Sequence, residues 1–158
     1  MALEEKLVDI LIEKGYHIAF AESCTGGLCC GTLVNAANAS KVLDMSFVTY
    51  ANEAKMQLLG VSAETILENG VVSEEVAAEM AQGVAKVAKS EIGVGITGVA
   101  GPGGGTAKKP VGMVCFGFSV NGVCKTFTMQ FGEIGRQQVR KSSVEFVYET
   151  LIEMLNNT

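Results

Sequence analysis

The sequence is poor in several residues on which common kinds of site depend. It has no tryptophan, two prolines and a single histidine, His17, in 158 residues. With one histidine and no paired-cysteine or carboxylate spacing of the usual kinds, we expect no metal site and no cofactor. The chain also lacks a Lys/Arg-rich run and has a formal net charge of -5, which disfavours nucleic acid and anionic membranes as partners. Any anion that the chain binds must therefore be held by local groups.

Long apolar runs and a disulfide pattern are also absent. No apolar stretch approaches the ~20 residues that a membrane-spanning helix needs. The N-terminal MALEEKLVDI is acidic and amphipathic, unlike a signal peptide. The five cysteines are an odd number, and Cys29 and Cys30 are adjacent, which does not resemble a disulfide framework. We therefore expect reduced thiols in a cytoplasmic protein.

Apolar residues, by contrast, make up 48% of the chain, which is enough for the core of one domain over residues 1–158. Periodicity and stop signals predict helices and strands that alternate along most of the chain. The expected helices are 3–14, 26–37, 52–59, 74–89 and 136–155, and the expected strands are 16–21, 45–51, 92–97, 111–120 and 123–131. Asn121-Gly122 predicts a hairpin that pairs Cys124 with Ser119, so a hairpin disulfide with Cys115 is not expected. This order predicts an α/β three-layer sandwich: a mixed sheet with helices on both faces, and a C-terminal β-hairpin followed by a helix.

The stretch FAESCTGGL, residues 20–28, places polar side chains just after a predicted strand. Ligands of α/β sheets bind at the carboxyl ends of strands, and Ser23 lies just past such an end. Gly26 and Gly27 would expose main-chain N–H groups at a helix start, where they can hold an anion or a developing oxyanion. The alternative is that Ser23 or Thr25 only caps the helix.

The stretch TYANEAK, residues 49–55, places a lysine where a helix dipole disfavours it. Tyr50 ends a predicted strand, Asn52 is a plausible N-cap, and Lys55 falls in the first helical turn. A lowered pKa would let Lys55 act as a neutral general base. The alternative is an ordinary surface lysine.

The stretch TGVAGPGGGTAKKPVG, residues 97–112, can neither continue a strand nor begin a helix. Glycine-rich backbone with threonines and two lysines suits a phosphate-binding nest. Residues 97–107 carry no charge, which is unlike a solvated linker. Residues 93–98 match G-x-G-x-x-G literally, but these glycines lie within a predicted strand and Gly101-Pro102 prevents a helix from following, so no dinucleotide site is expected.

His17 and the cysteines are more simply interpreted as structural residues. His17 lies near a strand start, and a Cys24–His17 nucleophile pair would have to span opposite ends of one short strand. The other cysteines, Cys29, Cys30, Cys115 and Cys124, fit the interiors of helices and strands as small apolar residues.

In these motifs the chain resembles the CinA C-terminal domain family, the nicotinamide-nucleotide amidases. The matching motifs are AESCTGGL, VTYANEAK, LLGV, VSEEVA, ITGVAGPGGGT and KPVG, which occur in this order between about residue 5 and residue 155. The resemblance implies hydrolysis of the carboxamide of nicotinamide mononucleotide to nicotinate mononucleotide and ammonia, without a cofactor or metal. Longer members carry an extra N-terminal domain that this sequence lacks, so the resemblance is to the stand-alone amidase, and we expect a homo-oligomer, as a dimer.

The resemblance also implies roles for particular residues. The family's catalytic serine corresponds to Ser23, its lysine to Lys55 and its tyrosine to Tyr50. Neutral Lys55 would take the proton of Ser23, and Tyr50 would either relay a proton or pack on the pyridine ring. The expected substrate-binding residues are Thr25, Gly26, Gly27, Asn52, the loop residues Thr97, Gly98, Ala100, Gly101, Gly103 and Gly104, and, for the phosphate, Arg136 and Arg140.

Two features depart from the family pattern. Gly135 stands where the family usually has an aspartate, and residues 35–46 lack the common Pro-Gly and paired-glycine features. Both concern the pocket mouth and the phosphate contacts rather than the reaction. Two other functions stay open: a non-catalytic module that senses a pyridine nucleotide, and a serine–lysine amidohydrolase acting on a different carboxamide.

Overall fold

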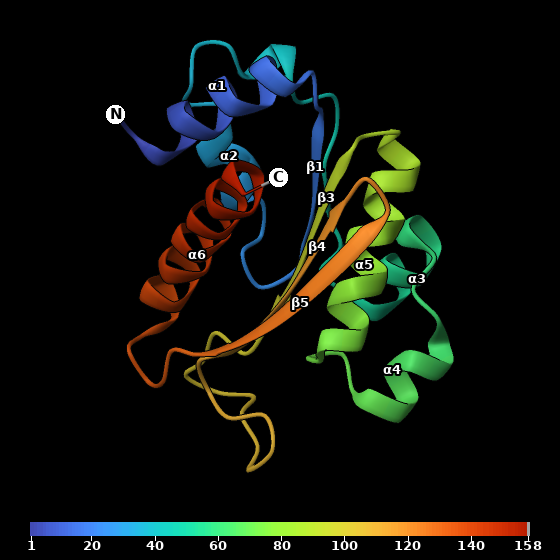
Figure 1. Ribbon diagram of the computed structural model, residues 1–158. Coiled ribbons are helices and arrows are strands. Elements are labelled where there is room, and N and C mark those ends of the chain that lie inside the picture. Colours follow the sequence, from blue (N-terminus) through green and yellow to red (C-terminus); the bar gives the residue numbers. More distant parts are fainter. Residues whose placement is uncertain (158) are drawn as a thin grey trace.

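Residues 1–157, which the computed structural model describes, form a five-stranded mixed sheet flanked by helices (Figure 1). The strands are β1 Ile18–Glu22, β2 Phe47–Val48, β3 Ile92–Gly98, β4 Met113–Val120 and β5 Val123–Gln130, in the spatial order β2-β1-β3-β4-β5. The helices are α1 Leu3–Lys14, α2 Leu28–Leu33, α3 Asn52–Leu59, α4 Ala63–Asn69, α5 Glu74–Ala88 and α6 Arg136–Asn156, with a short 3-10 helix at Ala39–Lys41. Helices α1, α2 and α6 cover one face of the sheet and α3, α4 and α5 lie on the other (Figure 1), which confirms the predicted three-layer α/β sandwich.

The strand directions bring three chain segments together at one end of the sheet. Strand β1 is parallel to both of its neighbours, β2 and β3, and its last residue, Glu22, pairs with Ile96 of β3. The main-chain N–H of Ser23 then donates to the carbonyl of Ile96, at 3.1 Å. Residues that follow β1, β2 and β3 therefore meet at the carboxyl ends of parallel strands, where ligands of α/β sheets bind.

Helix α5 packs against a part of the sheet that is lined by glycine. Gly95 and Gly117 lie opposite each other in the β3–β4 ladder. A Cβ atom at Gly95 would lie 2.3 Å from the carbonyl oxygen of Ala77 on α5, and one at Gly117 would lie 2.4 Å from the same oxygen. Glycine is therefore needed here so that the helix can approach the strands closely. The glycines that match G-x-G-x-x-G at 93–98 lie within β3, as predicted, and Gly93 and Gly95 face α5.

Helix α6 covers the other face with large apolar side chains. The predicted buried stripe is confirmed at Val144, Val147, Tyr148, Leu151 and Leu155. The hydroxyl of Tyr148 donates to the carbonyl of Cys29 at 2.6 Å, so the polar tip of this buried ring has a partner.

Several element boundaries differ from those predicted. The strand expected at 45–51 is only two residues long, Phe47–Val48, because it pairs with β1 alone at the sheet edge. The helix expected at 26–37 spans only Leu28–Leu33, and the strand expected at 16–21 begins at Ile18. Helix α4 was not predicted: it buries none of its residues, so it has no apolar stripe to recognise.

Other local predictions are confirmed. Ser73 caps α5 by accepting from the N–H of Val76, and Gly15 ends α1 in the left-handed conformation, with φ 70°. The hairpin pairs Ser119 with Cys124, and all five cysteines are free thiols. Within residues 1–157, none of the helices is both long and apolar enough to cross a membrane.

Candidate active site

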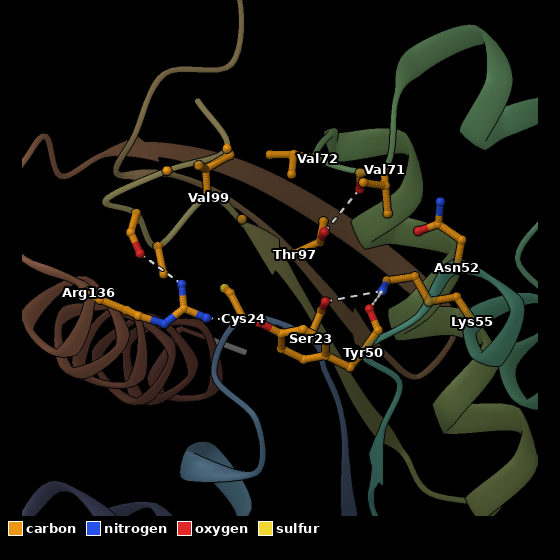
Figure 2. Close-up of a pocket in the computed structure, with 15 residues that line it drawn as sticks. Ser23, Cys24, Tyr50, Asn52, Lys55, Val71, Val72, Thr97, Val99 and Arg136 are labelled. Atoms are coloured by element: carbon orange, nitrogen blue, oxygen red, sulfur yellow. Dashed lines mark hydrogen bonds between the residues drawn. The ribbon is translucent and has the colours of Figure 1, made fainter. Parts of the chain in front are cut away.

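A cavity of about 300 Å³ opens at the carboxyl ends of the parallel strands (Figure 2). Residues from five parts of the chain line it: the segments that follow β1, β2 and β3, the segment between α4 and α5, and the start of α6. The lining residues are Ser23, Cys24, Tyr50, Asn52, Lys55, Val71, Val72, Thr97, Gly98, Val99, Ala100, Gly101, Gly103, Gly104 and Arg136. None of them is an acid, and Lys55 and Arg136 are basic, so the cavity is suited to an anionic ligand.

Ser23 lies on a tight turn that directly follows β1. The N–H of Gly26 donates to the carbonyl of Ser23 at 3.0 Å and closes this turn. Gly26 and Gly27 both have positive φ, 56° and 98°, which explains the paired glycines. However, neither glycine lines the cavity, and the N–H of Gly26 is already bonded to Ser23, so the prediction that Gly26 faces a substrate oxygen is wrong.

Glu22, which sequence reasoning missed, lies buried beside this turn. Its side chain is 1% exposed, and its carboxylate accepts from the hydroxyl of Thr25 at 2.6 Å. It also accepts from the main-chain N–H groups of Cys29 at 2.8 Å and Cys30 at 3.1 Å. Glu22 therefore supplies the acceptor that an N-capping Ser23 or Thr25 was expected to provide. The only signal in the sequence was an acid at the end of an otherwise apolar strand.

Thr25 does not reach the cavity. It is 0% exposed, and its hydroxyl donates to Glu22 rather than facing the pocket. Its predicted role as a substrate-binding residue is therefore corrected: Thr25 orients the turn.

Lys55 is fully buried, with 0% of its surface exposed. Its Nζ lies 3.1 Å from Ser23 Oγ and 3.2 Å from the carbonyl oxygen of Tyr50 (Figure 2). It also lies 2.6 Å from the carbonyl oxygen of Thr49. Burial lowers the pKa of Lys55 below its ordinary value of 10.5. The alternative of an ordinary surface lysine is thus excluded.

The three neighbours of the amine also fix its orientation. A neutral amine has two N–H bonds and one lone pair, and the two carbonyl oxygens can only accept. When both N–H bonds point at Thr49 and Tyr50, the lone pair is left for the one partner that carries a proton, the hydroxyl of Ser23. This is the geometry that general-base activation of a serine requires.

Tyr50 and Arg136 form the mouth of the cavity. Arg136 donates to the carbonyl of Gly101 at 2.8 Å and to the hydroxyl of Tyr50 at 2.9 Å, and Tyr50 is 60% exposed. Figure 2 shows Arg136 and Lys55 on opposite sides of Ser23. The Tyr50 hydroxyl contacts Arg136 rather than the dyad, which favours ring packing over proton relay.

Arg140 lies near Arg136 on α6 but serves a different segment. It donates to the carbonyls of Cys24 at 3.1 Å and Thr25 at 2.9 Å. It does not line the cavity. The phosphate role predicted for Arg140 is therefore corrected: this arginine braces the Ser23 turn, and Arg136 is the arginine at the pocket.

The end of β3 and the glycine-rich segment that follows it form one wall of the cavity, and phosphate binding by this wall stays a prediction. Thr97, Gly98, Ala100, Gly101, Gly103 and Gly104 all line the cavity. The hydroxyl of Thr97 donates to the carbonyl of Val71 at 3.0 Å, which holds the neighbouring wall in place. Lys109, by contrast, turns away and donates to the carbonyls of Asn69 and Val72.

Asn52 lines the cavity as predicted, but it does not cap α3. The N-cap is Ala51, which makes no side-chain hydrogen bond, and Asn52 is the first helical residue. Its amide side chain is directed to the Val71 side of the cavity in Figure 2.

Cys24 and His17 do not form a nucleophile pair. Burial raises the pKa of Cys24 to about 12, so its thiol stays protonated and unreactive. The His17 ring lies 2.7 Å from the carboxylate of Asp44, before β1 and away from Cys24. Within the described part of the chain, no group of three or more His, Cys, Asp or Glu side chains could hold a metal ion.

Comparison with known proteins identifies a family. The sequence model of the CinA C-terminal domain family matches residues 1–155. The chain is 52% identical over 149 residues to a protein of Clostridium acetobutylicum named for competence-damage induction, and 47% identical over 148 residues to a CinA-like protein of Kosmotoga olearia. Each alignment covers 94% of this chain and 36% of the relative, so the chain spans about a third of the length of these curated relatives.

Solved structures agree with this assignment. A CinA superfamily protein of Klebsiella pneumoniae superimposes with a TM-score of 0.94 at 34% identity, covering 99% of this chain and 97% of that one. A competence/damage inducible protein of Agrobacterium tumefaciens superimposes with a TM-score of 0.89 at 41% identity, with the same coverage of 99% and 97%.

Proposed function

Because the chain belongs to the CinA C-terminal domain family, we propose that it is an amidohydrolase that converts nicotinamide mononucleotide and water to nicotinate mononucleotide and ammonia. The observation that carries this proposal is the contact of 3.1 Å between Lys55 Nζ and Ser23 Oγ inside an acid-free cavity. A buried amine held against a serine hydroxyl is the arrangement of a nucleophile with its base.

The reaction begins when Ser23 Oγ attacks the carboxamide carbon and neutral Lys55 takes the hydroxyl proton. The resulting tetrahedral intermediate collapses as Lys55 returns the proton to the amide nitrogen, which leaves as ammonia. Water then attacks the acyl ester on Ser23, with Lys55 accepting one proton of the water and returning it to Ser23 Oγ. No cofactor or metal enters these steps.

The oxyanion of the intermediate needs main-chain donors other than Gly26 and Gly27. We assign this role to the N–H of Cys24, which follows the nucleophile and belongs to a residue that lines the cavity. The residue after the nucleophile supplies the same donor in other serine hydrolases. Cys24 thus acts through its backbone, while its thiol is a packed neighbour.

We infer that the phosphate of the substrate binds at the mouth of the cavity. Arg136 supplies a full positive charge there, next to the glycine-rich wall. Gly101, Gly103 and Gly104 in this wall have no side chains to block the approach of the phosphate to main-chain N–H groups. The pyridine ring then lies between the mouth and Ser23, where Tyr50 can pack against it.

Two other functions are less well supported. A sensor of pyridine nucleotides needs no base, yet Lys55 is a buried amine that folding must desolvate at a free-energy cost. A serine–lysine amidohydrolase for a different carboxamide would use the same dyad, and only the substrate distinguishes it. A cytoplasmic location, a homodimer and activity as a stand-alone domain stay predictions.

The test is to incubate the purified protein with nicotinamide mononucleotide and to follow both products, ammonia and nicotinate mononucleotide. We expect both to form in equal amounts, and Ser23→Ala to form neither. Nicotinamide riboside, which lacks the phosphate, should be the poorer substrate. Binding of nicotinamide mononucleotide without turnover would support the sensor instead.

A further inference from the structure

We propose that Glu22 is a positioning residue for the dyad: its carboxylate holds the turn that presents Ser23 to Lys55. This inference rests on the proposed function, since it assigns Ser23 as the nucleophile. Glu22 does not line the cavity, so it would act through the turn rather than through substrate.

The side chain of Glu22, the residue before the nucleophile, is bonded to residues that follow the nucleophile. Its carboxylate accepts from the Thr25 hydroxyl and from the N–H groups of Cys29 and Cys30, which closes the loop from residue 22 to residue 30 around Ser23. The two carboxylate oxygens can accept from all three donors, because a carboxylate offers about four lone-pair sites.

The main chain of Glu22 is linked to the base as well. The N–H of Thr49 donates to the carbonyl of Glu22 at 2.8 Å, and the carbonyl of Thr49 in turn accepts from Lys55 Nζ at 2.6 Å. Glu22 therefore links the turn that carries Ser23 to Thr49, whose carbonyl oxygen binds the amine of Lys55. A shift of Glu22 changes the distance between Ser23 and Lys55.

The ion-pair partner that a buried carboxylate usually needs is replaced here by hydrogen-bond donors. Within residues 1–157 the one ion pair found between side chains is that of His17 with Asp44, far from this turn. The stability of the buried Glu22 carboxylate thus depends on all three hydrogen bonds. Loss of any one of them leaves part of the cost of burying the carboxylate uncompensated.

The experiment compares Glu22→Gln, Thr25→Val and Thr25→Ser. Glutamine has the same shape but turns an N–H toward Cys29 or Cys30, where another N–H already points. Valine removes the Thr25 hydroxyl, and serine restores it. We expect Glu22→Gln and Thr25→Val to lower kcat about 100-fold with an unchanged KM, because small displacements of a nucleophile have effects of this size. Thr25→Ser should keep most of the wild-type kcat.

Glu79→Gln is the matched control. Glu79 also accepts from a main-chain N–H, that of Ser62 at 2.7 Å, and from a threonine hydroxyl, that of Thr65 at 2.6 Å. It joins α4 to α5 and does not line the cavity. Glu79→Gln should therefore lower the melting temperature without changing kcat per folded molecule, which separates positioning from stability.

A second readout does not depend on the substrate. A fluorophosphonate reacts with an activated serine: the Ser23 Oγ–P bond forms, the P–F bond breaks, fluoride leaves and Lys55 takes the proton. We expect Glu22→Gln and Thr25→Val to slow this labelling about as much as turnover. If wild-type protein is labelled but does not hydrolyse nicotinamide mononucleotide, the proposed function fails and the positioning role is judged from labelling rates alone.

Each outcome decides the matter. Wild-type labelling rates in folded Glu22→Gln or in Thr25→Val would overturn the positioning role. If Glu22→Gln fails to fold, the test compares the two Thr25 variants. Equal labelling rates for Thr25→Val and Thr25→Ser would then overturn the positioning role. A wild-type Ser23 that reacts with neither probe nor substrate would overturn both inferences, because a turn held in a productive geometry must be reactive.

Discussion

Replacement of Lys55 tests the mechanism most directly, through a pair of variants. Lys55→Arg keeps a positive charge but cannot deprotonate in a protein, whereas Lys55→Met keeps the straight aliphatic chain and has neither charge nor base. If Lys55 is the general base, both variants should be inactive. If Lys55 only attracts the substrate or an oxyanion, Lys55→Arg should retain activity and Lys55→Met should not.

The size of the loss follows from the contacts of the amine. Lys55 Nζ is the only side-chain nitrogen bonded to Ser23 Oγ within residues 1–157, so its removal leaves the serine without a base. General-base catalysis contributes about 100- to 10,000-fold, which corresponds to about 2.7 to 5.4 kcal/mol of barrier. We therefore expect kcat for both variants to fall by at least about 100-fold. Ligand-induced shifts in melting temperature should show that both still bind the nucleotide.

The pH dependence gives an independent reading of the same group. Because burial lowers the pKa of Lys55, the neutral amine becomes available at a lower pH than for a free lysine. We expect kcat/KM of the wild type to rise about tenfold per pH unit below this pKa and to level off above it. The residual activity of Lys55→Met should lack that limb.

Stability should respond to pH with a definite sign. The unfolded chain has a Lys55 pKa of about 10.4, above the lowered pKa of the folded state, so between the two values the unfolded state binds more protons. The free energy of unfolding therefore rises with pH across this window, by up to about 1.36 kcal/mol per unit. Below the window the cost of the buried ammonium is fully present, and above it the cost is gone. Urea unfolding of the wild type and Lys55→Met across the window measures the difference.

An active Lys55→Arg would refute the general-base role. So would a pH–rate profile that is the same in Lys55→Met and in the wild type. Circular dichroism serves as the control, since a guanidinium is larger than the amine that the three oxygens surround and a misfolded variant would be uninformative. In that case Lys55→Met and the wild-type pH profile still decide the question.

Three further predictions address other parts of the structure. Cys24→Ala should keep most of the activity, because the thiol is buried and its pKa is raised; a rate as low as that of Ser23→Ala would refute the nucleophile assignment. Arg136→Gln should raise KM for nicotinamide mononucleotide about 10- to 100-fold, so that the nucleotide is no longer a better substrate than nicotinamide riboside. Arg140→Gln should instead lower kcat and leave the preference for the nucleotide unchanged. The reverse result would mean that Arg140 binds the phosphate and Arg136 braces the turn. Gly117→Ala should lower the free energy of unfolding by about 1–3 kcal/mol in urea unfolding, since its Cβ would meet the Ala77 carbonyl. A Cβ at Gly103 would have no atom within 4 Å, so Gly103→Ala should leave the free energy of unfolding unchanged. Equal effects of the two substitutions would contradict the close packing of α5.

Much of the fold could be predicted because its signals are local. The apolar stripe of α6, the Ser73 cap and the Asn121-Gly122 turn each occupy a few consecutive residues, and all three are confirmed. The two-residue β2 and helix α4 could not be predicted in this way. Strand β2 depends on pairing with β1 at the sheet edge, and α4 is held by Glu79 of α5, so both depend on partners distant in sequence.

In the candidate site, too, some residues were predictable from local signals and others depend on partners distant in sequence. Ser23 and Lys55 were found from their places at a strand end and a helix start, and the structure brings them into contact. Thr25, Gly26 and Arg140 were assigned to substrate, yet each is used to build the turn. A sequence motif shows which residues belong to a site but not which of them face inward, because orientation is set by partners such as Glu22 that the motif does not single out.

The position of α6 determines when during synthesis the pocket can exist. Nucleophile and base both lie before residue 60, but Arg136 at the mouth and Arg140 behind the turn belong to the helix that follows β5. A nascent chain that has emerged only as far as β5 would have the dyad residues in an uncovered sheet, without the brace on Cys24 and Thr25. We therefore expect a chain cut after β5 to be inactive rather than weakly active, so that hydrolysis begins only once α6 has docked.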